Sequence, residues 1–352
     1  MLIAIDGFDA KPNDTSAAAM IRFPWTQLTA LAVSDTRSRF VSGKAGVLFS
    51  FNSMDYYVTS GQKDTTFVVG FALYVAGSNI VSPTLGFYTD NGANRQFFFT
   101  LDYTSTRSIR AFNQSSTSTV VMQTATNVLQ FNAWQYFEFK VYLNNSAASG
   151  YAEARIDGIT QMSGNLKTNN NATVLLWDRI NIGTPISTSN INTSPALDDF
   201  YLLNTSGQYN SDFLGDVHID IYYPVASGSY TQWTPSAGSN WQTVDEIPAD
   251  TSDYNYTSTS GAIDTFTFSS LPEYTSRIYA VELIQNAGKT GSQLRTLAPI
   301  IVYSGVTATG IFKAQPQNSF VYQSQIFDYN PVAASGWTAS GVMQSQFGYI
   351  AN

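Results

Sequence analysis

The sequence predicts an all-β protein, and three observations support this prediction. Apolar and polar residues alternate with a period of two along many segments, as in strands that bury one face. These segments are short and are separated by Gly, Asn, Asp and Ser, the residues of tight turns. Helical periodicity is rare, and we expect one short helix at Thr338–Gln346. Strands at such spacing are typical of a β-sandwich or a jelly roll.

The first half of the chain contains the clearest strand patterns. Thr65–Ala76 is β-branched and aromatic throughout, which predicts a strand covered on both faces. Trp134–Leu143 alternates strictly, with Phe139 on one face and Glu138 on the other. Tyr151–Ile156 then predicts the second strand of a hairpin. We expect further strands in this half at Arg95–Tyr103, Val120–Met122, Thr173–Trp177, Arg179–Ile182 and Phe200–Leu203.

The length and a change in composition predict two domains. A chain of 352 residues favours two cores over one. The composition changes after Asn204, and Pro224–Gly261 is rich in Ser, Gly, Thr and aromatic residues. We therefore predict a sandwich at 1–207 and a C-terminal β-rich domain at 208–352. In the second domain we expect strands at Val217–Tyr223, Asp264–Phe268, Arg277–Ile284, Leu297–Tyr303 and Val321–Phe327.

The charge content limits the partners of this protein. Charged residues are 12% of the chain, about half the usual share, and the formal net charge is -8. The 17 Lys and Arg residues are scattered, so we expect no nucleic acid partner and no anionic membrane partner. We expect no signal peptide, because no basic residue precedes the first apolar run and Asp6 interrupts that run early. We expect no membrane insertion, because no apolar run approaches about 20 residues. There are no cysteines.

Three segments of the first half resemble a known sandwich. Trp134–Gly158 begins with a predicted strand whose first residue is aromatic, and it continues into a hairpin that ends in the turn Asp157-Gly158. Ile180–Gly183 and Leu197–Tyr201 resemble the closing strands of the same fold. Together they resemble a concanavalin A-like or laminin G-like domain. This resemblance implies a two-sheet β-sandwich in the first domain.

The chain also resembles structural proteins of tailed-bacteriophage virions, in which such a sandwich precedes a C-terminal β region. The resemblance implies an assembly or attachment protein on the external surface of the virion: a tail fibre, baseplate or receptor-binding component, with a head decoration protein as the alternative. It also implies other virion proteins as partners, a homo-oligomer with a trimer favoured, and no active site. The motifs that carry it, in order, are Asp6–Asp9, Leu214–Val217, Trp233–Ser236, Val244–Glu246, Asp253–Tyr254, Asp328–Pro331, Trp337–Thr338 and Phe347–Gly348.

The candidate catalytic residues do not form a recognisable active site. A glycosidase on this sandwich needs paired carboxylates on one face of a strand. Glu138 and Glu153 could meet across the predicted hairpin, but Lys140 and Arg155 lie close in sequence. We favour a solvated cross-strand charge ladder and predict that the protein is not an enzyme. The only histidine, His218, is expected to be an outward-facing polar residue.

A calcium site is the one cofactor hypothesis. Folds of the kind resembled here often bind calcium through loop carboxylates and carbonyls. Asp198 and Asp199 are the candidate ligands, with Asp90-Asn91-Gly92 as a second position. We favour hydrogen-bonded turns at both places and expect no other cofactor.

Aromatic residues in the second domain are the candidate ligand-binding site. The residues concerned are Trp233, Trp241, Tyr254 and Tyr256. Aromatic faces stack on sugar rings, and nearby Asn, Ser and Asp side chains bind hydroxyls, so a host-surface glycan is the candidate ligand. The alternative is internal or intersubunit packing of the same rings. A carbohydrate-binding module or a glycosidase is therefore the alternative to a virion structural protein.

Overall fold

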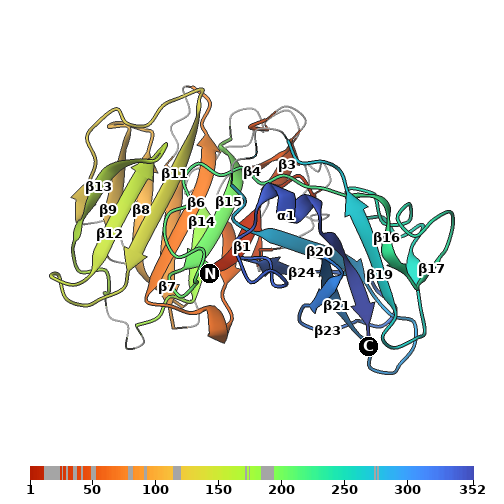
Figure 1. Ribbon diagram of the computed structural model, residues 1–352. Helices are drawn as coiled ribbons and strands as arrows, with labels where there is room; N and C mark the ends of the chain where they lie inside the picture. The colour runs from red at the N-terminus through yellow and green to blue at the C-terminus, as the bar shows by residue number, and fades with distance from the viewer. Residues whose placement is uncertain are drawn as a thin grey trace. The chain divides into compact units, whose positions relative to one another are not determined.

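The computed structural model confirms the all-β prediction (Figure 1). It describes residues 1–11, 24–25, 27–28, 31–34, 38–40, 43–48, 53–77, 82–90, 93–113, 120–170, 173, 175–183, 194–272, 275 and 277–352. These residues form two compact units, Met1–Asp220 and Ile221–Asn352. Asn91 and Gly92 of the predicted turn after Asp90 lie outside the described residues.

The first unit contains an antiparallel sheet built around β6 and β15. Thr66–Tyr74 forms β6, and its nearly continuous run of apolar side chains is buried on both faces, as predicted for this segment. The predicted hairpin is confirmed, and its register places Glu138 opposite Arg155 and not opposite Glu153. In spatial order the strands are β13 (Ile159–Asn165), β12 (Tyr151–Ile156), β11 (Trp134–Tyr142), β6, β15 (Ala196–Asn204), β4 (Ala45–Leu48) and β3 (Leu31–Ser34), and β1 (Leu2–Asp6) also pairs with β15.

A second antiparallel sheet packs against the first. It is also built from alternating segments, with apolar residues toward the first sheet and polar residues outward. A 3-10 turn at Ser60–Gln62 follows its strand β5. In spatial order the strands are β10 (Met122–Gln123), β9 (Ser108–Phe112), β8 (Asn94–Asp102), β7 (Thr84–Thr89), β14 (Arg179–Gly183), β5 (Ser53–Tyr57) and β2 (Gln27–Leu28).

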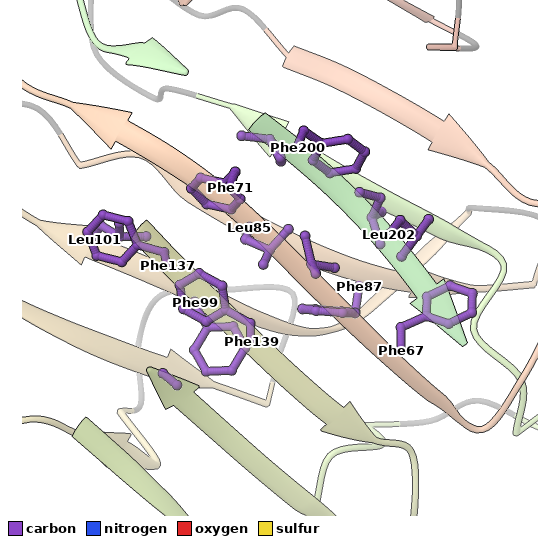
Figure 2. Packing of buried hydrophobic residues seen from close by; sticks show 14 of the residues in the cluster. Phe67, Phe71, Leu85, Phe87, Phe99, Leu101, Phe137, Phe139, Phe200 and Leu202 are labelled. Atoms are coloured by element: carbon purple, nitrogen blue, oxygen red, sulfur yellow. The ribbon is translucent and has the colours of Figure 1, made fainter. Parts of the chain in front are cut away.

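Aromatic rings from both sheets fill the space between them. Figure 2 shows this packing, in which Phe139 of β11 lies against Phe99 of β8 with ring centroids 4.7 Å apart. Trp177 is buried in the same core, and its indole N–H donates to the carbonyl of Val141 at 3.1 Å. The predicted strand Thr173–Trp177 is wrong over its described residues, because Trp177 makes only an isolated bridge with Asp64.

Residues 205–220, here called the strap, cover part of the outer face of the first sheet. The N–H of Gly215 donates to Glu138 at 2.8 Å, and the N–H of Leu214 donates to the hydroxyl of Tyr201 at 3.2 Å. The N–H of Ile219 likewise bonds to a carboxylate and not to a neighbouring strand. The predicted strand Val217–Tyr223 is therefore wrong, since side chains satisfy its backbone.

The second unit is a smaller antiparallel β structure. Its strands at 264–268, 297–303 and 321–327 fall where alternation predicts them, and the predicted helix is confirmed as α1 (Ala339–Met343), capped by Thr338. The main sheet has the order β16 (Pro224–Thr231), β19 (Ile263–Phe268), β25 (Gln346–Ala351), β21 (Thr296–Tyr303) and β22 (Val306–Thr309), with β23 (Lys313–Ala314) also on β21. Two pairs lie outside it, β17 (Thr234–Pro235) with β18 (Asn255–Tyr256) and β20 (Val281–Ala287) with β24 (Val321–Phe327).

The boundary between the two units lies at the C-terminal end of the strap. The predicted boundary at 207/208 precedes most of the strap, whereas the compact units divide between Asp220 and Ile221. In the described part of the chain, no helix has the length and apolar character needed to cross a membrane.

The Phe139 ring should contribute strongly to the stability of the sandwich. Phe139→Ala leaves a cavity beside Phe99, and we expect the free energy of unfolding to fall by about 3–5 kcal/mol in chemical denaturation. Ile159→Ala is the control, because Ile159 is exposed, and it should change stability by less than about 0.5 kcal/mol. Equal losses in both variants would contradict the packing described here.

Candidate functional site

The segment that contains Tyr254 and Tyr256 is anchored by the residue between them. The amide of Asn255 on β18 donates to the carbonyl of Asn240 at 2.7 Å and to the hydroxyl of Tyr349 at 2.8 Å. Since side chains alternate along a strand, an inward Asn255 turns both tyrosines outward. Tyr254 is 43% exposed and Tyr256 is 52% exposed.

Phe320 joins these two tyrosines to form an exposed aromatic surface. The ring centroids of Tyr254 and Tyr256 are 6.1 Å apart, and those of Tyr254 and Phe320 are 6.4 Å apart. Phe320 is 44% exposed and lies just before β24, far from the tyrosines in sequence. We call Tyr254, Tyr256 and Phe320 the aromatic platform. Sequence reasoning missed Phe320, because nothing in its local pattern indicates that the fold places it beside Tyr254.

The two predicted tryptophans are less exposed than the two platform tyrosines. The indole N–H of Trp233 donates to the carbonyl of Ala262 at 3.0 Å, and its ring packs edge-on against Tyr349 with centroids 4.8 Å apart. Trp241 is half-buried, and its carbonyl accepts from the N–H of Val244. Trp233 thus packs inside the unit, as the packing alternative expected, while Tyr254 and Tyr256 are the exposed members of the predicted set.

An acidic loop adjoins the aromatic platform. The hydroxyl of Tyr322, two residues after Phe320, donates to the carbonyl of Ala249 at 3.2 Å and so holds the loop against β24. Burial raises the pKa of Glu246, and so do the charges of three further carboxylates in this loop, those of Asp253, Asp245 and Asp250. The loop, which ends directly before Tyr254, therefore adds hydrogen-bond acceptors and negative charge near the aromatic platform.

The predicted calcium ligands Asp198 and Asp199 are buried and hydrogen-bonded. They lie at an irregularity in β15, where Asp199 adopts a positive φ of 50°. Asp198 accepts from the backbone N–H groups of Asp199 at 2.8 Å and Arg39 at 3.2 Å. Asp199 accepts from the guanidinium of Arg39 at 2.9 Å and from the N–H of Ile219 at 2.8 Å. The carboxylate oxygens thus already have protein donors.

Burial raises the pKa values of both acids. Burial raises the pKa of Asp198, and the neighbouring charge of Asp199 raises it further. Burial also raises the pKa of Asp9 to about 6, and the charges of Asp199 and Asp220 act in the same direction. In the described part of the chain, no group of three or more acidic or histidine side chains could hold a metal ion. Calcium binding at Asp198 and Asp199 stays a prediction.

Glu138 and Glu153 do not face each other. Glu138 pairs with Arg155 across the hairpin, and Glu153 pairs with Lys140. Both acids are buried, so the predicted solvated charge ladder is wrong. Glu153 forms its ion pair with Arg155 on the same strand, and Lys140 forms its ion pair with Asp212 of the strap. Glu138 accepts from the hydroxyl of Tyr201 at 2.6 Å as well as from the strap. Both carboxylates therefore take part in structural hydrogen bonds.

His218 lies in the strap and not on a strand. Its Nε2 is 3.2 Å from Oδ1 of Asp220, and its ring lies 3.9 Å from that of Phe40, measured between centroids. The side chain is partly exposed, so the predicted polar outward position is correct while the predicted strand is not.

No protein-family model matches this chain, and no curated relative matches it. Solved structures similar in fold include an endo-β-1,4-glucuronan lyase from the fungus Trichoderma reesei, with 11% identity over 55% of this chain and 94% of that chain and a TM-score of 0.39. The carbohydrate recognition domain of Emp46p has 10% identity over 55% of this chain and 94% of that chain, with a TM-score of 0.35.

A third similar structure is domain 4 of AbnA, a GH43 extracellular arabinanase from Geobacillus stearothermophilus. It has 15% identity over 57% of this chain and 91% of that chain, with a TM-score of 0.36. At such low identity the likeness to all three structures concerns the β-sandwich alone. The resemblance to bacteriophage virion proteins stays a prediction.

The raised pKa of Asp9 predicts a loss of stability as pH rises. The folded state binds this proton more tightly than the unfolded state, so the unfolding free energy should fall as pH rises from about 4 through about 6. Asp9→Asn keeps an acceptor for the N–H of Lys44 and removes the titration. We expect the fall between pH 4 and pH 7 to shrink by about 1 kcal/mol in urea denaturation, an amount reduced for partial solvent contact.

Asp250→Asn is the control for this pH experiment. Asp250 is fully exposed and its pKa is lowered by hydrogen bonds from Ser252, which is the opposite direction. Its removal should therefore not shrink the fall in stability between pH 4 and pH 7. An Asp9→Asn variant with an unchanged pH profile would show that burial does not raise this pKa.

Proposed function

We propose that this protein is a non-catalytic glycan-binding protein, and that the aromatic platform of its second unit contacts the sugar. The observation that supports the proposal is the exposure of three rings brought together from two distant segments. Rings held at a surface by a rigid scaffold give up little conformational entropy when a ligand stacks on them. The platform therefore suits a flat, partly apolar ligand such as a pyranose ring.

The chemistry around the platform favours a neutral glycan. Sugar hydroxyls need acceptors, and the acidic loop at 245–253 presents several beside the rings. The same carboxylates repel an acidic sugar, because like charges at close range are unfavourable. Neither tryptophan of the predicted set is required for this contact. The non-catalytic part of the proposal would be overturned if the protein hydrolysed a glycan and Glu138→Gln abolished that hydrolysis.

A second candidate function is assembly into a particle, as the bacteriophage resemblance implies. Among the described residues, seventeen large apolar side chains are exposed, and thirteen of them lie in the second unit. Exposed apolar side chains in such number suit burial against other subunits. On this proposal the protein is a virion structural protein that forms a homo-oligomer, with a trimer favoured by the resemblance. The thirteen are Tyr223, Val225, Tyr254, Tyr256, Ile284, Leu294, Val306, Ile311, Phe312, Phe320, Val321, Tyr329 and Met343.

Loss of either platform tyrosine should weaken glycan binding. We expect Tyr254→Ala and Tyr256→Ala each to raise the Kd for a neutral oligosaccharide found on a glycan array by about 10-fold, because a stacked ring is lost. Isothermal titration calorimetry measures the change. Tyr329→Ala is the matched control, since Tyr329 is a similarly exposed tyrosine of the same unit. Equal losses in the control, or an array without neutral glycans among its hits, would contradict the proposal.

The assembly proposal predicts an oligomer that depends on the second unit. Leu294 is 74% exposed and Ile311 is 65% exposed. We expect the double variant Leu294→Ser/Ile311→Ser to have a smaller mass in light scattering than the wild-type chain, because apolar contacts between subunits are lost. Ile159→Ser, at a 67% exposed position of the first unit, should leave the mass unchanged. A monomeric wild-type chain at high concentration would contradict self-assembly.

A further inference from the structure

A row of alternating tyrosine and arginine side chains crosses the outer face of the second sheet. Arg179 on β14 lies directly between Tyr57 on β5 and Tyr88 on β7 in the strand register, and Tyr88 lies opposite Arg95 on β8. All four side chains are partly exposed. We call Tyr57, Arg179, Tyr88 and Arg95 the tyrosine–arginine row. Neither the sandwich core nor the aromatic platform uses it.

Both guanidinium groups of the row are held in place by aromatic rings. The guanidinium of Arg179 lies 4.3 Å from the ring centroid of Tyr88 and 5.0 Å from that of Tyr57. The guanidinium of Arg95 lies 4.0 Å above the buried ring of Phe98. Stacking of this kind fixes a planar guanidinium before any ligand arrives.

Local backbone features bring Tyr88 and Arg95 together. A bulge in the pairing of β7 with β8 turns Arg95 to the outer face, although strict alternation would place it with the core residue Phe97. Gly86 leaves space beside the two side chains: a Cβ there would lie 2.9 Å from the ring of Tyr88 and 3.3 Å from Cδ of Arg95. The hydroxyl of Tyr88 is also hydrogen-bonded to Arg95. The aromatic ring and the cation are thus adjacent.

The charge around Tyr88 is positive, in contrast to the chain as a whole. Burial raises the pKa of Tyr88, while the positive charges of Arg95 and Arg179 act against this. Asp55 acts with burial, and it accepts from the guanidinium of Arg179 at 2.6 Å. The positive charges of Arg95 and Arg179 favour a negatively charged ligand at this face, even though the chain carries a net charge of -8.

We propose that the tyrosine–arginine row binds a uronic acid residue of an acidic polysaccharide. The ring face of a pyranose would stack on the tyrosines, and its carboxylate would accept hydrogen bonds from the adjacent guanidinium of Arg95. Aromatic and cationic groups alternate at the spacing of neighbouring strands, about 4.8 Å, which suits a flat ring that carries its charge at one edge. Asn181, beside Arg179, supplies a further polar group.

The row differs from the aromatic platform in both position and charge. It lies on the first unit, is positive and takes an acidic sugar, whereas the platform lies on the second unit beside carboxylates. The inference does not depend on the proposed function. Either site can fail without the other, and variants at one site should leave binding at the other unchanged.

The test is isothermal titration of the full chain with trigalacturonate and with its methyl ester, which removes the charge and keeps the sugar ring. We expect binding of the acid and at least 10-fold weaker binding of the ester, because the charge-assisted hydrogen bonds are lost. Arg95→Gln should weaken binding of the acid to the same extent. Arg107→Gln is the control, since Arg107 belongs to the same unit and bonds to Asn127 outside the row.

Two further measurements keep the proposal testable if Arg95→Gln alters the fold. Wild-type binding of trigalacturonate should weaken as salt rises from about 0.05 M to about 0.5 M, because screening reduces the attraction. Tyr256→Ala, at the aromatic platform, should leave the binding of trigalacturonate unchanged. The proposal is overturned if trigalacturonate does not bind at about 10 mM or if its ester binds equally well. It is also overturned if Arg107→Gln causes the same loss, or if hexaglutamate binds as tightly, which would assign the face to acidic peptides.

Discussion

Burial of β11 and β15 on both faces is the constraint on which the first unit depends. One face of these strands lies in the aromatic core, and the other lies under the strap. Partners within the chain stabilise polar groups on the covered face, since an unpaired buried carboxylate is costly. Oε1 of Glu138 has two such partners, whereas its buried Oε2 has no hydrogen-bond partner among the described residues. Glu138 binds the strap backbone at Gly215, and Asp199 binds it at Ile219. Arg39 completes the network by pairing with Asp199 and Asp216.

This constraint also explains residues that looked like candidates for catalysis or metal binding. Acidic residues on a β-sandwich are candidates for glycosidase carboxylates or for calcium ligands. In this chain Glu138 and Asp199 each accept hydrogen bonds from the strap, so they hold a covering segment in place. The opening motif has a similar role: Asp6 accepts from the indole of Trp25, and a Cβ at Gly7 would lie 2.5 Å from the carbonyl of Ile219.

The two proposed binding surfaces consist of side chains that do not belong to the two hydrophobic cores. Each lies on side chains that point away from a packed layer, and each places aromatic rings beside charged groups, carboxylates at the platform and two guanidinium groups at the row. The signs are opposite, so the surfaces should discriminate between neutral and acidic sugars by repulsion as well as by attraction. The platform tyrosines could be predicted, because they stand in an aromatic-rich segment. Phe320 could not, because only the docking of β24 beside the acidic loop places it there.

The sequence alone determined the all-β class, the strict alternation of β11 and the exact span of β24, because side-chain periodicity is a local property of the chain. It could not determine where an alternating segment fails to form a strand, or where a side chain lies on the opposite face from the one that alternation predicts. Val217–Tyr223 alternates like a strand, yet the carboxylate of Asp199 on β15 accepts from its backbone N–H at Ile219. Arg95 is in phase with Phe97, yet a bulge turns it to the opposite face. The first outcome depends on Asp199, a hydrogen-bond partner on another strand, and the second depends on how β7 pairs with β8. Neither can be read from the alternation of side chains within one segment.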